Sequence, residues 1–122
     1  MTLDDALGFE LLTLENETAY GRVRIDERHL QPMDIVHGGV YAALAETLAS
    51  HATAQAVSDD GMVALGMSND TSFFRPVSNG VVHAEARRLH GGRTTWVWDV
   101  RMTDGEGRLC AASRVTVAVR QR

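Results

Sequence analysis

The feature that most restricts the fold is one long helical segment, expected over residues 37–57, in a chain whose other regular segments look like strands. Val40, Leu44 and Leu48 fall on one narrow stripe of that helix, the pattern of a helix packed on a sheet. A single helix covers a broad antiparallel sheet only when the sheet curves around it. We therefore expect an α+β fold, with about six strands wrapping one long central helix. The expected strands span residues 7–14, 18–26, 62–75, 80–89, 94–103 and 108–119.

The size and charge of the chain indicate a single domain over residues 1–122, with 44% apolar and 23% charged residues. The net charge is −4 without any block of like charge, so we expect neither a nucleic-acid nor a membrane partner. No apolar run is long enough to cross a bilayer, and the start of the chain is acidic where a signal peptide would be basic. Cys110 is the one cysteine, which excludes an internal disulfide. These features favour the cytoplasm.

The face of the expected helix opposite the apolar stripe consists almost entirely of small residues around one carboxylate, Glu46. A solvent-facing helix usually carries several charges, whereas small side chains permit close approach by another backbone. We therefore expect this face to be buried against a second subunit. Its members are Gly39, Ala42, Ala43, Glu46, Ala49, Ser50 and Thr53.

The helix begins with His37-Gly38-Gly39, and this start suits an anion. Free amides at a helix N-terminus point outward at the positive end of the dipole, and glycines let a ligand approach them. Such a site fits a phosphate or the oxyanion that forms when a carbonyl is attacked. With Glu46 further along the same helix, the pair matches the needs of acyl transfer. His37 taken alone is more typical of a residue that hydrogen-bonds locally at the helix start.

Other catalytic arrangements lack support in the sequence. There are twelve Arg and no Lys, which excludes a Schiff-base lysine and leaves Arg or backbone amides to hold phosphate. No Gly-x-Ser-x-Gly motif is present, and Cys110 is expected to be a small core residue rather than a nucleophile. The histidines have no metal-ligand spacing, so no metal and no cofactor are expected.

The segment from Val36 to Leu48, with its His-Gly-Gly start and its acidic residue, resembles the signature of hotdog-fold acyl-CoA thioesterases. The resemblance is to the phenylacetate-pathway and 4-hydroxybenzoyl-CoA thioesterase type, a group that includes the enterobactin-pathway proofreading thioesterase. It extends through Gln31-Pro32, the segment 74–78 and the segment 89–93, and so covers the chain from about residue 20. Many members have Asp where this chain has Glu46.

The resemblance implies roles for particular residues. Glu46 would be the nucleophile or general base, and the Gly38 amide would donate to the thioester carbonyl. Gln31 and His37 would orient that carbonyl, and Ser50 would position water. Positions that match the coenzyme A (CoA) site are Gly66, Phe73, Phe74, Arg75, Pro76, His90, Gly91, Gly92, Arg93, Thr94 and Thr95.

The resemblance also implies a homodimer whose subunits share each active site, and a homotetramer built from such dimers. CoA would be part of the substrate. The aromatic residues favour an aryl or medium-chain acyl group. Two alternatives stay open: a hotdog-fold hydratase or dehydratase, which moves a proton next to a thioester, and a non-catalytic acyl-CoA-binding module. The nine-residue step from His37 to Glu46 suits attack on a carbonyl.

Overall fold

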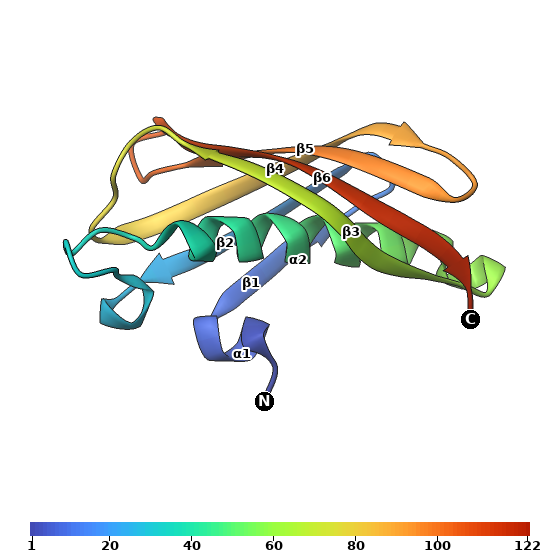
Figure 1. Cartoon of the computed structure of the whole chain (residues 1–122), viewed down its shortest axis with the longest axis horizontal. Helices are drawn as coiled ribbons and strands as arrows, with labels where there is room; N and C mark the ends of the chain where they lie inside the picture. The colour runs from blue at the N-terminus through green and yellow to red at the C-terminus, as the bar shows by residue number, and fades with distance from the viewer.

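The computed structural model describes residues 1–122 and consists of one sheet curved around one long helix (Figure 1). All neighbouring strands are antiparallel, in the order β1-β2-β4-β5-β6-β3. The expected α+β arrangement of six strands around a central helix is therefore confirmed. The elements are α1 (Leu3–Leu7), β1 (Phe9–Leu14), β2 (Thr18–Ile25), η1 (Glu27–His29), α2 (Gly38–Val57), η2 (Ser58–Asp60), β3 (Met62–Phe73), β4 (Gly80–Gly91), β5 (Thr95–Thr103) and β6 (Leu109–Gln121).

The core lies between α2 and the concave face of the sheet. Leu44 and Leu48 are completely buried and Val40 nearly so, which confirms the predicted stripe. Trp98 on β5 packs against the helix and donates from Nε1 to Thr53 Oγ1 at 2.9 Å. Cys110 is completely buried in the same core. The helix is thus held by apolar contact along its length and by one buried hydrogen bond to the sheet.

The small-residue face of α2 differs from the expectation. Ala49 and Thr53 belong to the core of this chain and cannot form part of a subunit interface. The 100° step per residue rotates these two positions far enough toward the sheet to be covered by it. The remaining members, centred on Glu46, stay exposed or half-buried.

The start of the chain also differs, since residues 3–7 form a short helix where a strand was expected from residue 7. Thr2 and Asp5 form a reciprocal capping box at its N-terminus. Gly8 ends it in the left-handed conformation, with φ of 71°. Figure 1 shows α1 on the far side of α2 from most of the sheet. The capping signal, Thr2 followed three residues later by an acid, is visible in the sequence.

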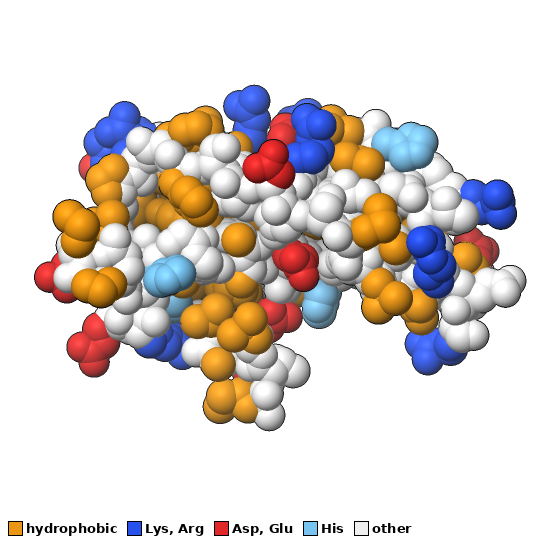
Figure 2. All heavy atoms as spheres, in the orientation of Figure 1, with side chains coloured by type: hydrophobic (Ala, Val, Ile, Leu, Met, Phe, Trp, Pro, Cys, Tyr) orange, Lys and Arg blue, Asp and Glu red, His pale blue; other side chains and the backbone are white.

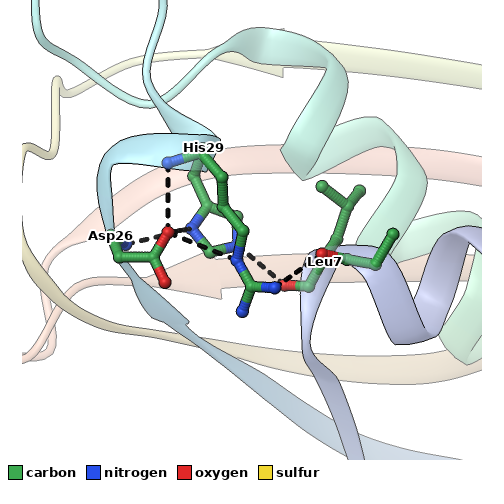
Figure 3. Close-up of polar contacts among 5 residues, drawn as sticks. Leu7, Asp26 and His29 are labelled. Carbon is green, nitrogen blue, oxygen red and sulfur yellow. Dashed lines mark hydrogen bonds and ion pairs between the residues drawn. The ribbon is translucent and has the colours of Figure 1, made fainter.

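A buried histidine fixes α1 to the loop before α2 (Figure 3). His29 Nδ1 accepts from the Asp26 backbone N–H at 3.0 Å, and its Nε2 therefore donates to the Leu7 carbonyl at 2.7 Å. Arg28 Nη1 donates to the Ala6 carbonyl at 2.6 Å. These contacts hold the last turn of α1 in one place although none of its five residues is buried.

The two edges of the sheet are β1 and β3. β3 pairs only with β6, and that pairing has an irregularity between Gly66 and Ser68. Its exposed residues include Leu65 and Met67, each more than half exposed. None of the helices combines the length and the apolar character required to span a bilayer.

Candidate active site

The start of α2 carries an unpaired amide. His37 caps the helix by accepting from the Gly39 N–H on Nδ1 at 2.8 Å, and its carbonyl accepts from the Val40 N–H at 2.9 Å. The Gly38 N–H, the first of the helix, has no partner in the chain. His37 thus acts as the local cap that its sequence context favours. The capping bond needs an unprotonated Nδ1, which places the ring proton of neutral His37 on Nε2.

Phe73 packs directly on the Gly38 backbone. A Cβ atom built on Gly38 would lie 2.8 Å from Phe73 Cζ, so only glycine fits here without movement of the ring. The ring also lies 6.1 Å from that of Tyr41, centroid to centroid. The end of β3 is thereby held against the start of α2.

The Gly38 amide opens onto a pocket of about 460 Å³, which we call the Gly38 pocket. Gln31 contributes its side chain, whose Oε1 accepts from the Met33 N–H and leaves the amide NH₂ free to donate. Arg75 is exposed and takes part in no ion pair. The structure therefore brings together six of the residues selected from the sequence. The lining residues are Gln31, Ile35, Val36, Gly38, Tyr41, Phe73, Phe74, Arg75 and Pro76.

Glu46 lies in a different pocket, of about 420 Å³, which we call the Glu46 pocket. The carboxylate is exposed and has neither a hydrogen bond nor an ion pair within the chain. A Cβ atom on Gly66 of β3 would lie 3.1 Å from Glu46 Oε2, so the glycine makes room for the carboxylate. Gly66 is placed against Glu46, away from the Gly38 pocket where Phe73 and Arg75 lie. The lining residues are Leu3, Ala42, Ala43, Glu46, Thr47, Asn69 and Thr71.

A polar network beside Glu46 joins β3 and β6 to α2 and was not anticipated from the sequence. Asn69 Nδ2 donates to the Ala42 carbonyl at 2.9 Å, and Thr71 Oγ1 donates to Asn69 Oδ1 at 2.7 Å. Because Thr71 has one proton, the 2.7 Å contact with Ser113 Oγ is a bond that Ser113 donates. In an α-helix the Ala42 carbonyl also accepts from the Glu46 N–H. The network thus supports the turn that carries the carboxylate.

Gly38 and Glu46 do not meet within one chain. Eight residues separate them on α2, and a rise of 1.5 Å per residue places their backbones about 12 Å apart along the axis. They line separate pockets. One carbonyl cannot contact both groups of the same chain. Glu46 and the Gly38 N–H could therefore act on one carbonyl only if they came from two copies of the chain. Ser50 lies one turn beyond Glu46 and is half-buried.

The third group of predicted residues lies at the far end of the sheet, between β4 and β5. Arg88 covers Gly91, and a Cβ atom on Gly91 would lie 2.8 Å from Arg88 Nη1. The Arg88 guanidinium lies over the Trp96 ring, with Cζ 4.9 Å from the ring centroid. Trp96 Nε1 donates to the Gly92 carbonyl at 2.9 Å. These contacts give both glycines a packing role in the turn.

The surface beside this turn is a pocket of about 390 Å³ lined by Arg88, Gly91, Gly92, Arg93 and Trp96 among others. Arg93, Thr94 and His90 are exposed. The Arg93 guanidinium, like that of Arg75, forms no ion pair in the chain. Thr95 uses its carbonyl to accept from the Gly92 N–H at 2.9 Å. This group is separate from both the Gly38 pocket and the Glu46 pocket.

The buried titratable groups do not offer an alternative centre. Burial raises the pKa of the Cys110 thiol, and its Sγ donates to the Met102 carbonyl at 3.1 Å. Burial likewise raises the pKa of Tyr41, so this phenol stays protonated. No group of three or more His, Cys, Asp or Glu side chains is arranged to hold a metal ion. The exposed carboxylate of Glu46 and the free Gly38 amide remain the candidate reactive groups.

Known proteins with similar sequences are thioesterases and related hydrolases. Residues 33–111 match the family model described as the thioesterase superfamily. The proofreading thioesterase EntH of Cronobacter turicensis is 37% identical over 97% of this chain and 85% of its own length. The 1,4-dihydroxy-2-naphthoyl-CoA hydrolase of Listeria monocytogenes is 32% identical over 100% of this chain and 98% of its own.

Solved structures agree with the sequence relatives. A mutant of the thioesterase PA1618 from Pseudomonas aeruginosa superimposes with a TM-score of 0.93 at 32% identity, covering 98% of this chain and 86% of that one. The thioesterase HI1161 from Haemophilus influenzae gives a TM-score of 0.92 at 32% identity, covering 98% and 83%. With its wrapped helix and these relatives, the chain belongs to the thioesterase superfamily and is a hotdog-fold thioester hydrolase.

Proposed function

We propose that this protein hydrolyses an acyl-CoA thioester, with an aryl or medium-chain acyl group, to the free acid and CoA. Glu46 acts as nucleophile or general base, and the Gly38 amide stabilises the oxyanion. The observation that carries the proposal is that one helix presents both an unpaired carboxylate and an unpaired N-terminal N–H, each opening onto a pocket. A carboxylate can attack the carbonyl or activate water, and a free N–H can stabilise the oxyanion, so this combination suits thioester hydrolysis.

The reaction needs both groups at one thioester carbonyl. The Gly38 N–H must contact the carbonyl oxygen, and Glu46 must lie beside the carbonyl carbon. In one route Glu46 takes a proton from water, and the water oxygen bonds to the carbonyl carbon. In the other route Glu46 itself bonds to that carbon, and water then cleaves the mixed anhydride. Both routes break the C–S bond, the CoA thiolate leaves and takes up a proton, and negative charge builds on the carbonyl oxygen. A donor such as the Gly38 N–H contributes about 2.7–4 kcal/mol to the transition state in comparable sites.

The CoA end of the substrate is proposed to lie along Arg75 and Arg93. Both guanidinium groups are exposed and free of carboxylate partners, so they are available for phosphate. Gln31 and His37 lie near the Gly38 amide, where their N–H groups would orient the carbonyl. The Listeria monocytogenes relative is named as a CoA-thioester hydrolase, which favours CoA as the thiol carrier. We therefore also propose a cytoplasmic location for the enzyme.

The separation of Glu46 from Gly38 in one chain supports a homodimer with shared sites. Two copies of α2 running in opposite directions would bring Glu46 of one subunit to the Gly38 pocket of the other. The unpaired edge of β3, with Leu65 and Met67 exposed, is the surface proposed to pair. Two such dimers would form the tetramer.

The first test offers purified protein a panel of benzoyl-, phenylacetyl- and straight-chain acyl-CoAs while released thiol is measured. We expect hydrolysis of some members and a loss of at least about a hundredfold in kcat for Glu46→Gln. Circular dichroism would check that the variant stays folded. Gln keeps the size of the side chain and removes its negative charge, and the carboxylate has no structural partner whose loss could unfold the protein.

Two outcomes would contradict the proposal. An unchanged rate in Glu46→Gln removes Glu46 from the mechanism. Enoyl-CoA hydration without thiol release would instead identify a hydratase. Arg75→Ala and Arg93→Ala are expected to raise KM for acyl-CoA more than they lower kcat, since they bind the part of the substrate that does not react.

A further inference from the structure

The N-terminal helix α1 makes no contribution to the hydrophobic core, yet it is held in place at several points. None of its five residues is buried. Asp4 Oδ1 accepts from Thr47 Oγ1 at 2.6 Å, and Asp4 Oδ2 lies 3.6 Å from His51 Nε2. Together with the bonds from Arg28 and His29 to the Ala6 and Leu7 carbonyls, these contacts tie α1 to the exposed side of α2 and to the loop before it.

The position in which α1 is held is the rim of the Glu46 pocket. Leu3 lines that pocket together with the β3 residues Asn69 and Thr71. Leu3 is 63% exposed, so its side chain is available to contact a ligand in that pocket. Figure 2 shows hydrophobic side chains gathered on the lower projection that α1 forms in Figure 1.

The chemistry of the Glu46 pocket suits the acyl group rather than the nucleotide. Three of its seven lining residues, Leu3, Ala42 and Ala43, are apolar, the other four are Glu46, Thr47, Asn69 and Thr71, and none is a cation. The free arginines, which the CoA phosphates need, line the other two pockets. The reacting carbon must lie about 3–3.5 Å from an attacking oxygen that is Glu46 or a water bound to it. The acyl chain therefore begins in this pocket.

We propose that α1 is the outer wall of the acyl pocket and that Leu3 limits the length of acyl group that fits beside Glu46. The inference rests on the proposed hydrolysis of acyl-CoA and adds to it the element that selects the acyl group. The two walls differ in composition. On the β3 side, the hydrogen-bonded network of Asn69, Thr71 and Ser113 fixes the wall. On the α1 side, one leucine on a short exposed helix sets the boundary.

The test measures kcat/KM against acyl chain length, from acetyl- to palmitoyl-CoA, for the full chain and its Leu3 variants. Leu3→Trp fills the rim and is expected to lower kcat/KM for chains longer than the wild-type optimum by at least about tenfold, with acetyl-CoA changed less than about twofold. Leu3→Ala opens the rim and should move the optimum to longer chains. Asp4→Ala removes the hydrogen bond from Thr47 to α1. It should also move the optimum toward longer chains and make kcat/KM depend less on chain length. Leu12→Trp and Leu12→Ala, at an exposed leucine of β1, are the matched controls and should keep the wild-type profile.

Binding separates this inference from the proposed function. In the Glu46→Gln background, calorimetry should show that Leu3→Trp weakens binding of long acyl-CoAs and leaves free CoA unaffected. If the wild type releases thiol in a Glu46-dependent manner but every Leu3 variant keeps the wild-type profile, the role of α1 is wrong and the proposed function stands. If the wild type hydrolyses no acyl-CoA, both fail together.

Discussion

At the scale of single residues, two glycines lack a Cβ atom where a neighbouring side chain packs beside the candidate site. Gly38 is covered by the Phe73 ring, and Gly66 lies against the Glu46 carboxylate. Each glycine belongs to a different element from the group it accommodates. At both positions an added Cβ atom would crowd the neighbouring side chain.

We expect Gly66→Ala to lower kcat by about a few-fold, because a Cβ atom 3.1 Å from Glu46 Oε2 would push the carboxylate a few tenths of an ångström away from its position. KM for acyl-CoA should change little. Steady-state thiol release measures both constants. Gly105→Ala, at a turn where no atom lies within 4 Å of the added Cβ, is the control. Equal kcat values for the two variants would show that Glu46 does not need the space.

At the scale of elements, the Asn69 side-chain amide forms a hydrogen bond between β3 and α2. Asn69 Nδ2 donates to the Ala42 carbonyl, one turn before Glu46. In Asn69→Asp the shape is kept, but a carboxylate cannot donate, and it would face a carbonyl oxygen and Thr71. We expect the free energy of unfolding at neutral pH to fall by about 1–3 kcal/mol, as for other buried groups left without a partner. Urea titration measures it, with the exposed Asn79→Asp as control. If both variants unfold at the same urea concentration, this hydrogen bond does not contribute to the free energy of unfolding.

At the scale of the whole molecule, the length of α2 determines where the reacting groups can meet. Glu46 and Gly38 of one chain lie about 12 Å apart along the helix, so a shared site requires two chains. Variants defective in different groups should therefore complement each other. Glu46→Gln removes the carboxylate. Gly38→Pro removes the N–H at the first helical position, where the fixed φ of proline suits a helix, although its Cβ atom requires the Phe73 ring to move.

Each variant alone should be nearly inactive, whereas co-expression of the two, followed by purification on two tags, should recover activity. Purification on both tags leaves only mixed dimers, and each mixed dimer holds one intact site of two, so we expect about half of the wild-type rate. Gly38→Ala adds a Cβ atom against Phe73 but keeps the N–H, so it separates the effect of crowding from loss of the donor. A mixture no more active than its components would place both groups in the same chain.

Much of the architecture followed from the sequence, because it depends on periodic patterns. The stripe of Val40, Leu44 and Leu48 defined the helix and the face it buries, and alternation on β5 and β6 identified the strands to within a few residues. The His37-Gly38-Gly39 start and Glu46 were chosen from residue types and spacing alone. These features are local, so they can be recognised from residues close together in the sequence.

The arrangement of the candidate site was decided only by the tertiary structure. The sequence placed Gly38 and Glu46 on one helix, but their rise along its axis separates them into two pockets. It did not indicate that Gly66 would face Glu46, that Asn69 would reach the Ala42 carbonyl, or that Asp4 would hold α1 beside Glu46. These contacts join residues 20 to 43 positions apart, and they exist because the sheet curves around α2. Residue periodicity determines which face of an element is buried, whereas the curvature of the sheet determines which elements that face meets.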